Sequence, residues 1–127
     1  MLANDRASQA MGISIDVPEP GTAIAAMTVR EDMSNGFGVL HGGLTFALAD
    51  TAFAFACNAY DRRTVAASAQ IEFLRPARVG DELTATAVED YRGRRNGYYS
   101  VEVRNQDDEL IALFRGRSVG SDEALLK

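Results

Sequence analysis

The sequence has few residues for sulfur or metal chemistry, because Cys57 is its one cysteine and His41 its one histidine. A single cysteine excludes a disulfide within the chain. Zinc and haem sites take most of their ligands from cysteine and histidine, so we expect neither a metal nor another cofactor. Disulfide-stabilised and metal-dependent classes of protein are therefore poor interpretations of this chain.

Positive charge and long apolar runs are scarce as well. With 13 Lys and Arg against 18 Asp and Glu, the net charge of -5 argues against a nucleic-acid-binding protein. Asn4, Asp5 and Arg6 come early and no apolar run follows them, so we expect no signal peptide and a cytoplasmic location. A length of 127 residues is typical of one domain, which we place at residues 1–127.

The patterning predicts two helices, at Ala3–Met11 and Gly42–Tyr60, and strands over most of the rest. We expect the strands at Ile13–Val17, Thr22–Arg30, Thr64–Leu74, Glu82–Tyr91, Tyr98–Asn105 and Leu110–Val119. Short turns between most of them imply antiparallel pairing. The predicted fold class is α+β, with a curved antiparallel sheet of five to six strands wrapped around one long central helix.

Three local expectations accompany this fold. Alternation on Thr64–Leu74 places one set of apolar side chains on one face, namely Val65, Ala67, Ala69, Ile71 and Phe73. The dipeptide Asn96-Gly97 predicts a hairpin turn. The tail Gly120–Lys127 is expected to be loose.

The predicted helix Gly42–Tyr60 carries apolar residues almost all the way round, which indicates burial rather than a surface position. A membrane span needs about 20 apolar residues without a central carboxylate, and Asp50 interrupts this run. We therefore interpret it as a core helix.

Adjacent glycines, Gly42 and Gly43, stand where this helix begins. They leave backbone N–H groups unobstructed where the helix dipole adds positive charge, so this end can polarise a carbonyl and stabilise an oxyanion. Close packing or a tight turn would also explain glycines here, and the residues alone leave both interpretations open.

Asp50 is costly to bury in an apolar helix unless it is paired or hydrogen-bonded. Its neighbours on the same face are small, namely Gly43, Ala47, Ala54, Cys57 and Asn58. A functional aspartate in a cleft therefore fits better than a structural one held by a hydroxyl. His41 and Asp50 are nine residues apart, about 900° of helical rotation, so they point to opposite sides. Two antiparallel helices across a dimer axis would bring them together, which predicts active sites shared between subunits.

Ser68 is either an ordinary strand serine or a hydrogen-bond partner for Asp50 or for a water. No GxSxG elbow is present, which argues against a serine hydrolase. The many late arginines are typical of solvated faces and protected edge strands, and some could bind phosphates. The sequence does not choose among them.

Three segments, NGFGVLHGGLTFALADTAFAFACN, ASAQIEFLRPARVGDELTATA and LIALFRGRS, resemble the phenylacetic-acid-degradation type of hotdog-fold acyl-CoA thioesterases. The resemblance spans Met11 to Ser118. It implies a hotdog fold and hydrolysis of an acyl-CoA thioester to free acid and CoA, with phenylacetyl-CoA or hydroxyphenylacetyl-CoA as the first candidate substrates. It also implies a homotetramer built as a dimer of dimers.

By position, the resemblance assigns a role to each of five residues. Asp50 would be the nucleophile or the general base, supplied by the neighbouring subunit. The Gly42 N–H would polarise the thioester carbonyl, and Asn35 would position the carbonyl or the water. His41 would orient the loop near the thiol leaving group, and Ser68 would assist Asp50 or the water.

Two alternatives remain at this point. A hotdog hydratase or dehydratase would show an HFPG-like motif, which is absent. A non-catalytic acyl-CoA-binding module or sensor on the same fold is the second interpretation. The combination of Asp50 with Gly42 favours the enzyme, since a binding module requires neither.

Overall fold

The structure is a computed structural model that describes residues 2–60 and 62–121. The described residues contain three short helical elements and one long helix. The short ones are η1 Leu2–Asn4, α1 Arg6–Ala10 and η2 Glu31–Met33, and the long one is α2 Gly42–Cys57. The strands are β1 Ser14–Glu19, β2 Thr22–Thr28, β3 Thr64–Phe73, β4 Glu82–Arg92, β5 Asn96–Arg104 and β6 Leu110–Gly120. The expectation of a loose tail falls mostly on residues outside the described ones.

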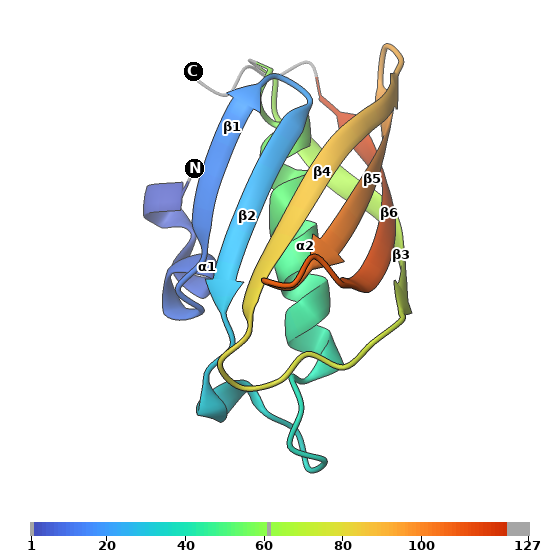
Figure 1. Ribbon diagram of the computed structural model, residues 1–127. Helices are drawn as coiled ribbons and strands as arrows, with labels where there is room; N and C mark the ends of the chain where they lie inside the picture. Colours follow the sequence, from blue (N-terminus) through green and yellow to red (C-terminus); the bar gives the residue numbers. More distant parts are fainter. Residues whose placement is uncertain (1, 61, 122–127) are drawn as a thin grey trace.

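The six strands form one antiparallel sheet in the order β1-β2-β4-β5-β6-β3. The sheet curves, and α2 lies against its concave face (Figure 1). This confirms the predicted α+β class with one long helix and a curved sheet. No helix among the described residues is long and apolar enough to cross a membrane.

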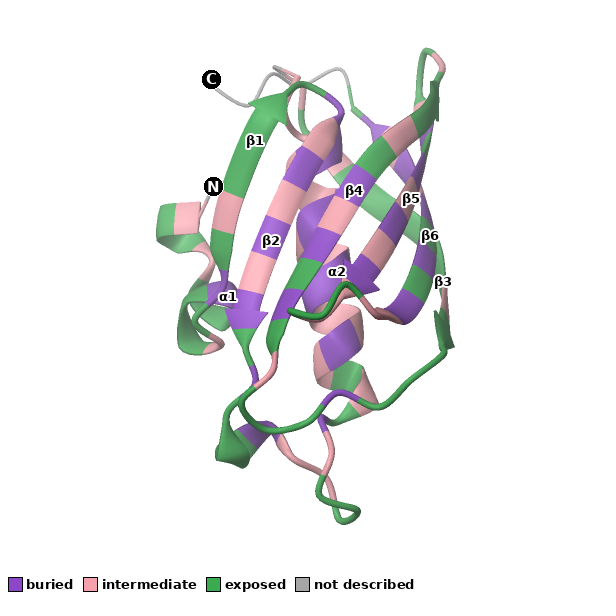
Figure 2. Cartoon of the chain, in the orientation of Figure 1, coloured by how far each residue is buried: buried purple, intermediate pink, exposed green. Residues whose placement is uncertain are grey.

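The core lies between the concave face and α2, and buried positions alternate with half-buried or exposed ones along β2, β4, β5 and β6 (Figure 2). Several inward positions are alanines, which let the helix approach the sheet closely. They are Ala23, Ala25, Ala85, Ala87 and Ala112. Phe53 of α2 fills the centre, with its ring 5.5 Å from that of Tyr99 and 5.7 Å from that of Phe114.

One side of α2 is left uncovered by the sheet. The buried face comprises Thr45, Leu48, Ala49, Ala52, Phe53, Ala56 and Cys57. Gly43 is exposed, while Ala47, Asp50 and Ala54 are only half-buried. The prediction that this helix is buried all round is therefore wrong for a single chain, because six strands curve around only one side of it.

Side-chain caps set the helix boundaries. The predicted helix over residues 3–11 is divided because the Asp5 carboxylate accepts a hydrogen bond from the Ser8 N–H at 3.0 Å and so begins α1 there. At the other end, α2 stops at Cys57 rather than at Tyr60. The Asn58 side chain donates to Ala54 O and accepts from Thr64 N, both at 2.9 Å, and turns the chain into β3.

A bulge on β3 overturns the predicted face of this strand. Ala66 pairs with Ser118 and Ser68 pairs with Arg117, so Ala67 is the extra residue between them. The bulge shifts the alternation by one position. Ala69, Ile71 and Phe73 remain on the concave side, but Val65 lies on the opposite side from them. The alternation rule failed because it assumes a regular strand.

The predicted hairpin is confirmed, since β4 and β5 pair antiparallel, but its turn lies at residues 93–95 and Asn96 and Gly97 already begin β5. Gly97 is required for a close approach rather than for a turn. A Cβ there would lie 2.8 Å from Ser118 Oγ and 2.9 Å from the Tyr99 ring. The Asn96 side chain is held by a 2.8 Å hydrogen bond from Arg117.

Candidate active site

The N-terminus of α2 is capped by His41. Its Nδ1 accepts a hydrogen bond from the Gly43 N–H at 3.0 Å, and its backbone N–H donates to Met33 O at 2.9 Å. Because Nδ1 is an acceptor, the proton of the neutral ring lies on Nε2. The exposed His41 therefore holds the start of the helix and keeps one N–H available to a ligand.

Gly42 is the first residue of α2, and its N–H has no acceptor within residues 2–60 and 62–121. A Cβ at this position would lie 3.3 Å from two carbons of the Phe73 ring, so only glycine fits without displacing that ring. Gly42 lines a cavity of about 310 Å³ whose other walls are mainly apolar, among them Phe73, Leu74, Pro76 and Ile111. An unpaired donor at a positive helix end thus adjoins an apolar cavity.

Asn35 organises the loop that leads into this helix. Its Oδ1 accepts from the Phe37 N–H at 2.9 Å and from the Val39 N–H at 3.4 Å. A bridge between Ser34 and Leu40 then closes the loop next to His41. With Oδ1 occupied, the Asn35 amide keeps its NH2 group as a donor. The structure therefore gathers Asn35, His41 and Gly42 at one end of α2.

Asp50 lies two turns further along α2, on its uncovered side. Its carboxylate has no hydrogen bond or ion pair with the rest of the described chain, and burial raises its pKa above the ordinary value. One helical repeat away, burial and then the charge of Asp50 raise the pKa of the Cys57 thiol to about 12, against a backbone hydrogen bond that lowers it. Asp50 is the basic group of this region, and Cys57 is an unreactive thiol.

Distance separates Asp50 from the other predicted residues. Asp50 follows Gly42 by eight helical positions, which corresponds to about 12 Å along the axis. A general base has to lie within about 3 Å of the proton that it removes. Asp50 therefore cannot act on a carbonyl held by the Gly42 N–H of its own chain.

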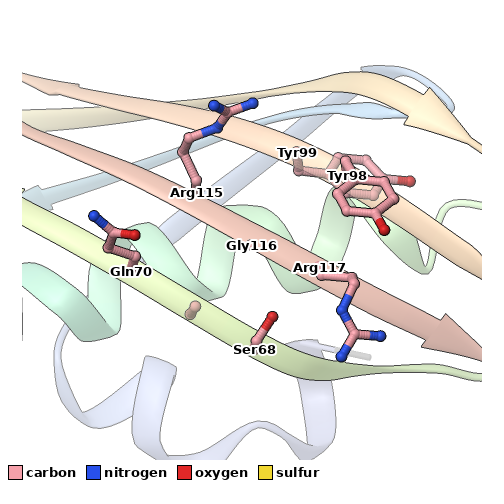
Figure 3. Close-up of a pocket in the computed structure, with 8 residues that line it drawn as sticks. Ser68, Gln70, Tyr98, Tyr99, Arg115, Gly116 and Arg117 are labelled. Atoms are coloured by element: carbon pink, nitrogen blue, oxygen red, sulfur yellow. The ribbon is translucent and has the colours of Figure 1, made fainter.

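The structure does not bring Ser68 to Asp50 within one chain. The register after the bulge places Ser68 beside Arg117 on the convex side of the sheet, whereas α2 lies on the concave side (Figure 3). The alternation on Thr64–Leu74 had already placed Ser68 on the face opposite the inward residues. That alternation therefore gave no support to a contact between Ser68 and Asp50.

Phe73 lines the candidate site, and the sequence did not single it out for that role. It is 57% exposed and packs against Gly42, so it forms a wall between the helix end and the cavity. The sequence placed Phe73 on the apolar face of its strand, but nothing in the sequence indicated that it lies against the start of α2. No group of three or more His, Cys, Asp or Glu side chains that could hold a metal occurs in residues 2–60 and 62–121.

Comparisons with known proteins identify the family. Residues 37–112 match the sequence family described as the Thioesterase superfamily. The chain is 47% identical to acyl-coenzyme A thioesterase PaaI of Escherichia coli over 118 residues, which covers 93% of this chain and 84% of that protein. It is 33% identical to human acyl-coenzyme A thioesterase 13 over 99 residues, covering 76% of this chain and 71% of the relative.

Solved structures give the same result. The E. coli PaaI protein from the phenylacetic acid degradation operon superimposes with a TM-score of 0.95 at 44% identity, covering 98% of this chain and 90% of that one. The TT0310 protein from Thermus thermophilus follows with a TM-score of 0.87 at 39% identity, covering 91% and 97%. The expected hotdog fold is confirmed.

The raised pKa of Asp50 predicts how stability changes with pH. Its folded-state pKa lies above the unfolded value because burial disfavours the carboxylate, so ionisation destabilises the folded chain as pH rises past the unfolded value of about 3.9. We expect Asp50→Asn to unfold at higher urea concentration than the wild type at pH 7.5, with the advantage vanishing near pH 3. Asp16→Asn, at an exposed position of β1, is the matched control. If the wild type were more stable than Asp50→Asn at pH 7.5, the folded protein would have to stabilise the Asp50 carboxylate, which would contradict the absence of a partner for it.

Proposed function

The chain belongs to the thioesterase superfamily and is an acyl-CoA thioester hydrolase, and from this premise we propose its substrate and its catalytic residues. The proposed substrate is an aryl-acyl-CoA, with phenylacetyl-CoA or hydroxyphenylacetyl-CoA first, and the products are the free acid and CoA. The observation that carries the mechanism is the pair of unpartnered groups on α2, the Gly42 N–H at its end and the Asp50 carboxylate in its middle.

Hydrolysis proceeds through groups that these positions supply. The carboxylate of Asp50 removes a proton from water, and the water oxygen attacks the thioester carbon. The Gly42 N–H and the helix dipole stabilise the oxyanion. The carbon–sulfur bond then breaks, and the thiolate takes the proton that Asp50 received from water, so the carboxylate is regenerated. The Nε2–H of His41 can donate a hydrogen bond to the leaving sulfur. Asn35 positions the carbonyl or the water through its free NH2 group.

Two copies of the chain are needed for one such site. Because about 12 Å of helix separates Gly42 from Asp50, the two groups of one site come from different chains. The free edge of the sheet suits this arrangement, since β3 is accessible on both faces and Val65 and Phe73 are 59% and 57% exposed. Antiparallel pairing of two β3 edges would set two α2 helices antiparallel, with each N-terminus directed toward the Asp50 of the other.

The small residues beside Asp50 on the uncovered side of α2 support this arrangement. Gly43, Ala47 and Ala54 present little side chain there, so the partner subunit can approach the helix closely. The homotetramer that the resemblance implies stays a prediction. The role of Ser68 stays a prediction from the resemblance alone, because it faces away from α2.

The cavity beside Gly42 supports an aryl acyl group. Its apolar walls include the ring of Phe73, and it opens where the thioester carbonyl would meet the helix end. Two other phenylalanines do not suit such a pocket, because Phe53 is fully buried in the core and Phe37 is 91% exposed. A non-catalytic acyl-CoA-binding module is disfavoured, since the similar proteins are named as thioesterases.

Asp50→Asn tests the catalytic base. We expect the wild type to release free thiol from phenylacetyl-CoA, with kcat/KM rising with pH through the raised pKa of Asp50. The variant should lose about 10²–10⁴-fold in kcat and the dependence on pH, while Asp16→Asn keeps both. Turnover by Asp50→Asn at the wild-type rate would refute the role of Asp50. The same assay over hydroxyphenylacetyl-, benzoyl- and straight-chain acyl-CoAs measures the acyl preference.

Gly42→Pro tests the oxyanion donor, because it removes one N–H with little change of backbone. Proline is favoured at the first helical position, and His41 has the extended ψ of 130° that a residue before proline adopts. We expect kcat to fall about 10²–10³-fold. Gly42→Ala also adds a Cβ against Phe73 but keeps the N–H, so it should lose much less. Equal losses in the two variants would show a steric effect rather than a lost donor.

A further inference from the structure

A second pocket, of about 420 Å³, lies on the convex face of the sheet, on the other side from α2. It spans β3, β5 and β6, and Figure 3 shows Arg115 and Arg117 projecting from β6 beside Tyr98, Ser68 and Gln70. None of the catalytic steps described above uses Arg115, Arg117 or Tyr98.

The strand register builds this pocket from two neighbouring rows of side chains that cross the sheet. One row is Tyr91, Tyr98, Arg117 and Ser68. The other row is Val88, Ser100, Arg115 and Gln70. Arg115 and Arg117 are two residues apart on one strand, so their side chains leave the same face about 7 Å apart. That separation lets two guanidinium groups converge on one phosphate or diphosphate.

The positive charge of this pocket is only partly balanced. The nearest carboxylate to Arg115 is Asp90, at 3.8 Å, and Asp90 also accepts a hydrogen bond from the Ser100 hydroxyl. Arg117 donates at 2.8 Å to the neutral amide of Asn96. Of the two guanidinium groups, Arg115 thus has a carboxylate nearby, which also binds Ser100, and Arg117 has a neutral partner.

Two arginines elsewhere in the fold are more closely paired. Arg75, at the cavity beside Gly42, lies 2.7 Å from Glu109. Arg104, on the convex face of β5, lies 3.0 Å from Glu102. The pocket of Arg115 and Arg117 is therefore better suited to an added anion than either of these.

Aromatic surface adjoins the arginines in the same row. Tyr91 and Tyr98 are 63% and 43% exposed, and their ring centroids are 6.2 Å apart. Exposed tyrosine rings beside guanidinium groups suit a ligand that joins phosphates to a flat heterocycle, because a base stacks on the ring while the phosphates bind the arginines.

We propose that this pocket binds the nucleotide half of the acyl-CoA substrate, with its phosphates on Arg115 and Arg117 and its adenine against Tyr98. The inference rests on the proposed function, which supplies a substrate with an adenosine 3′,5′-diphosphate end. The pocket reaches the edge strand β3 through Ser68 and Gln70, so in the proposed dimer it adjoins the seam where the catalytic groups of two chains meet.

Calorimetric titration with adenosine 3′,5′-diphosphate tests the site without turnover. The wild type and Asp50→Asn should bind this ligand equally, and adenosine 5′-monophosphate, which lacks the 3′-phosphate, should bind at least about tenfold more weakly. Arg115→Gln with Arg117→Gln should lose about tenfold or more in affinity, and Arg104→Gln should lose none. Tyr98→Ala should weaken binding, and Tyr98→Phe should keep it. A wild type that does not discriminate the two nucleotides, or a double variant that binds as well as the wild type, would overturn the proposal.

Kinetics separate this site from the catalytic one. For the double arginine variant we expect KM for phenylacetyl-CoA to rise about tenfold with kcat nearly unchanged, and KM for the phenylacetyl thioester of N-acetylcysteamine to stay constant. Equal rises of KM for both substrates would show a structural effect and contradict the nucleotide site. Absence of hydrolysis by the wild type, together with arginine-dependent binding, would refute the proposed function and leave the nucleotide site standing.

Discussion

The rigid length of α2 is the constraint on which the rest of the structure depends. A helix fixes the separation of its residues. Within the part of the chain that the structure describes, this one holds an unpaired N–H at its first residue and an unpaired carboxylate about 12 Å further along. No side-chain rearrangement can close that distance within one chain. The two groups become useful to one substrate only if a second copy supplies one of them. Oligomer formation is thus part of the proposed chemistry rather than an addition to it.

The sheet is built in a way that permits such an assembly. Alanines on its concave face let α2 pack closely, yet six strands cover only one side of the helix, so Asp50 is left at the border of the core. The same half-burial that leaves the carboxylate without a partner raises its pKa, which makes it a better base. Strand β3 stays open at the edge, and its convex side carries Ser68 and Gln70 into the arginine pocket. One strand therefore adjoins both regions that a long substrate would occupy.

Much of the fold could be predicted from the sequence, because the spacing of apolar residues and the residues that begin and end helices are local properties of the chain. The alternation of strands and the apolar run from Gly42 predicted the α+β class. The odd charge of Asp50 indicated a functional carboxylate, whereas the glycines at the start of the helix left two interpretations open. The failures have a common cause in tertiary contacts. The bulge at Ala67 depends on how β3 meets β6, and Gly97 is a glycine because Ser118 and Tyr99 approach it closely. The partial exposure of α2 could not be foreseen either, since a run of apolar residues does not show whether a sheet or another subunit covers them.

The most direct measurement concerns mixed dimers. Chains with Asp50→Asn and chains with Gly42→Pro, carrying different affinity tags, can be co-expressed and the mixed species purified through both tags. If sites are shared, one site of each mixed dimer receives both intact groups, so we predict about half of the wild-type activity per dimer from two inactive parents. Mixed dimers as inactive as either parent would show that each site is contained in one chain, and would contradict the shared active site.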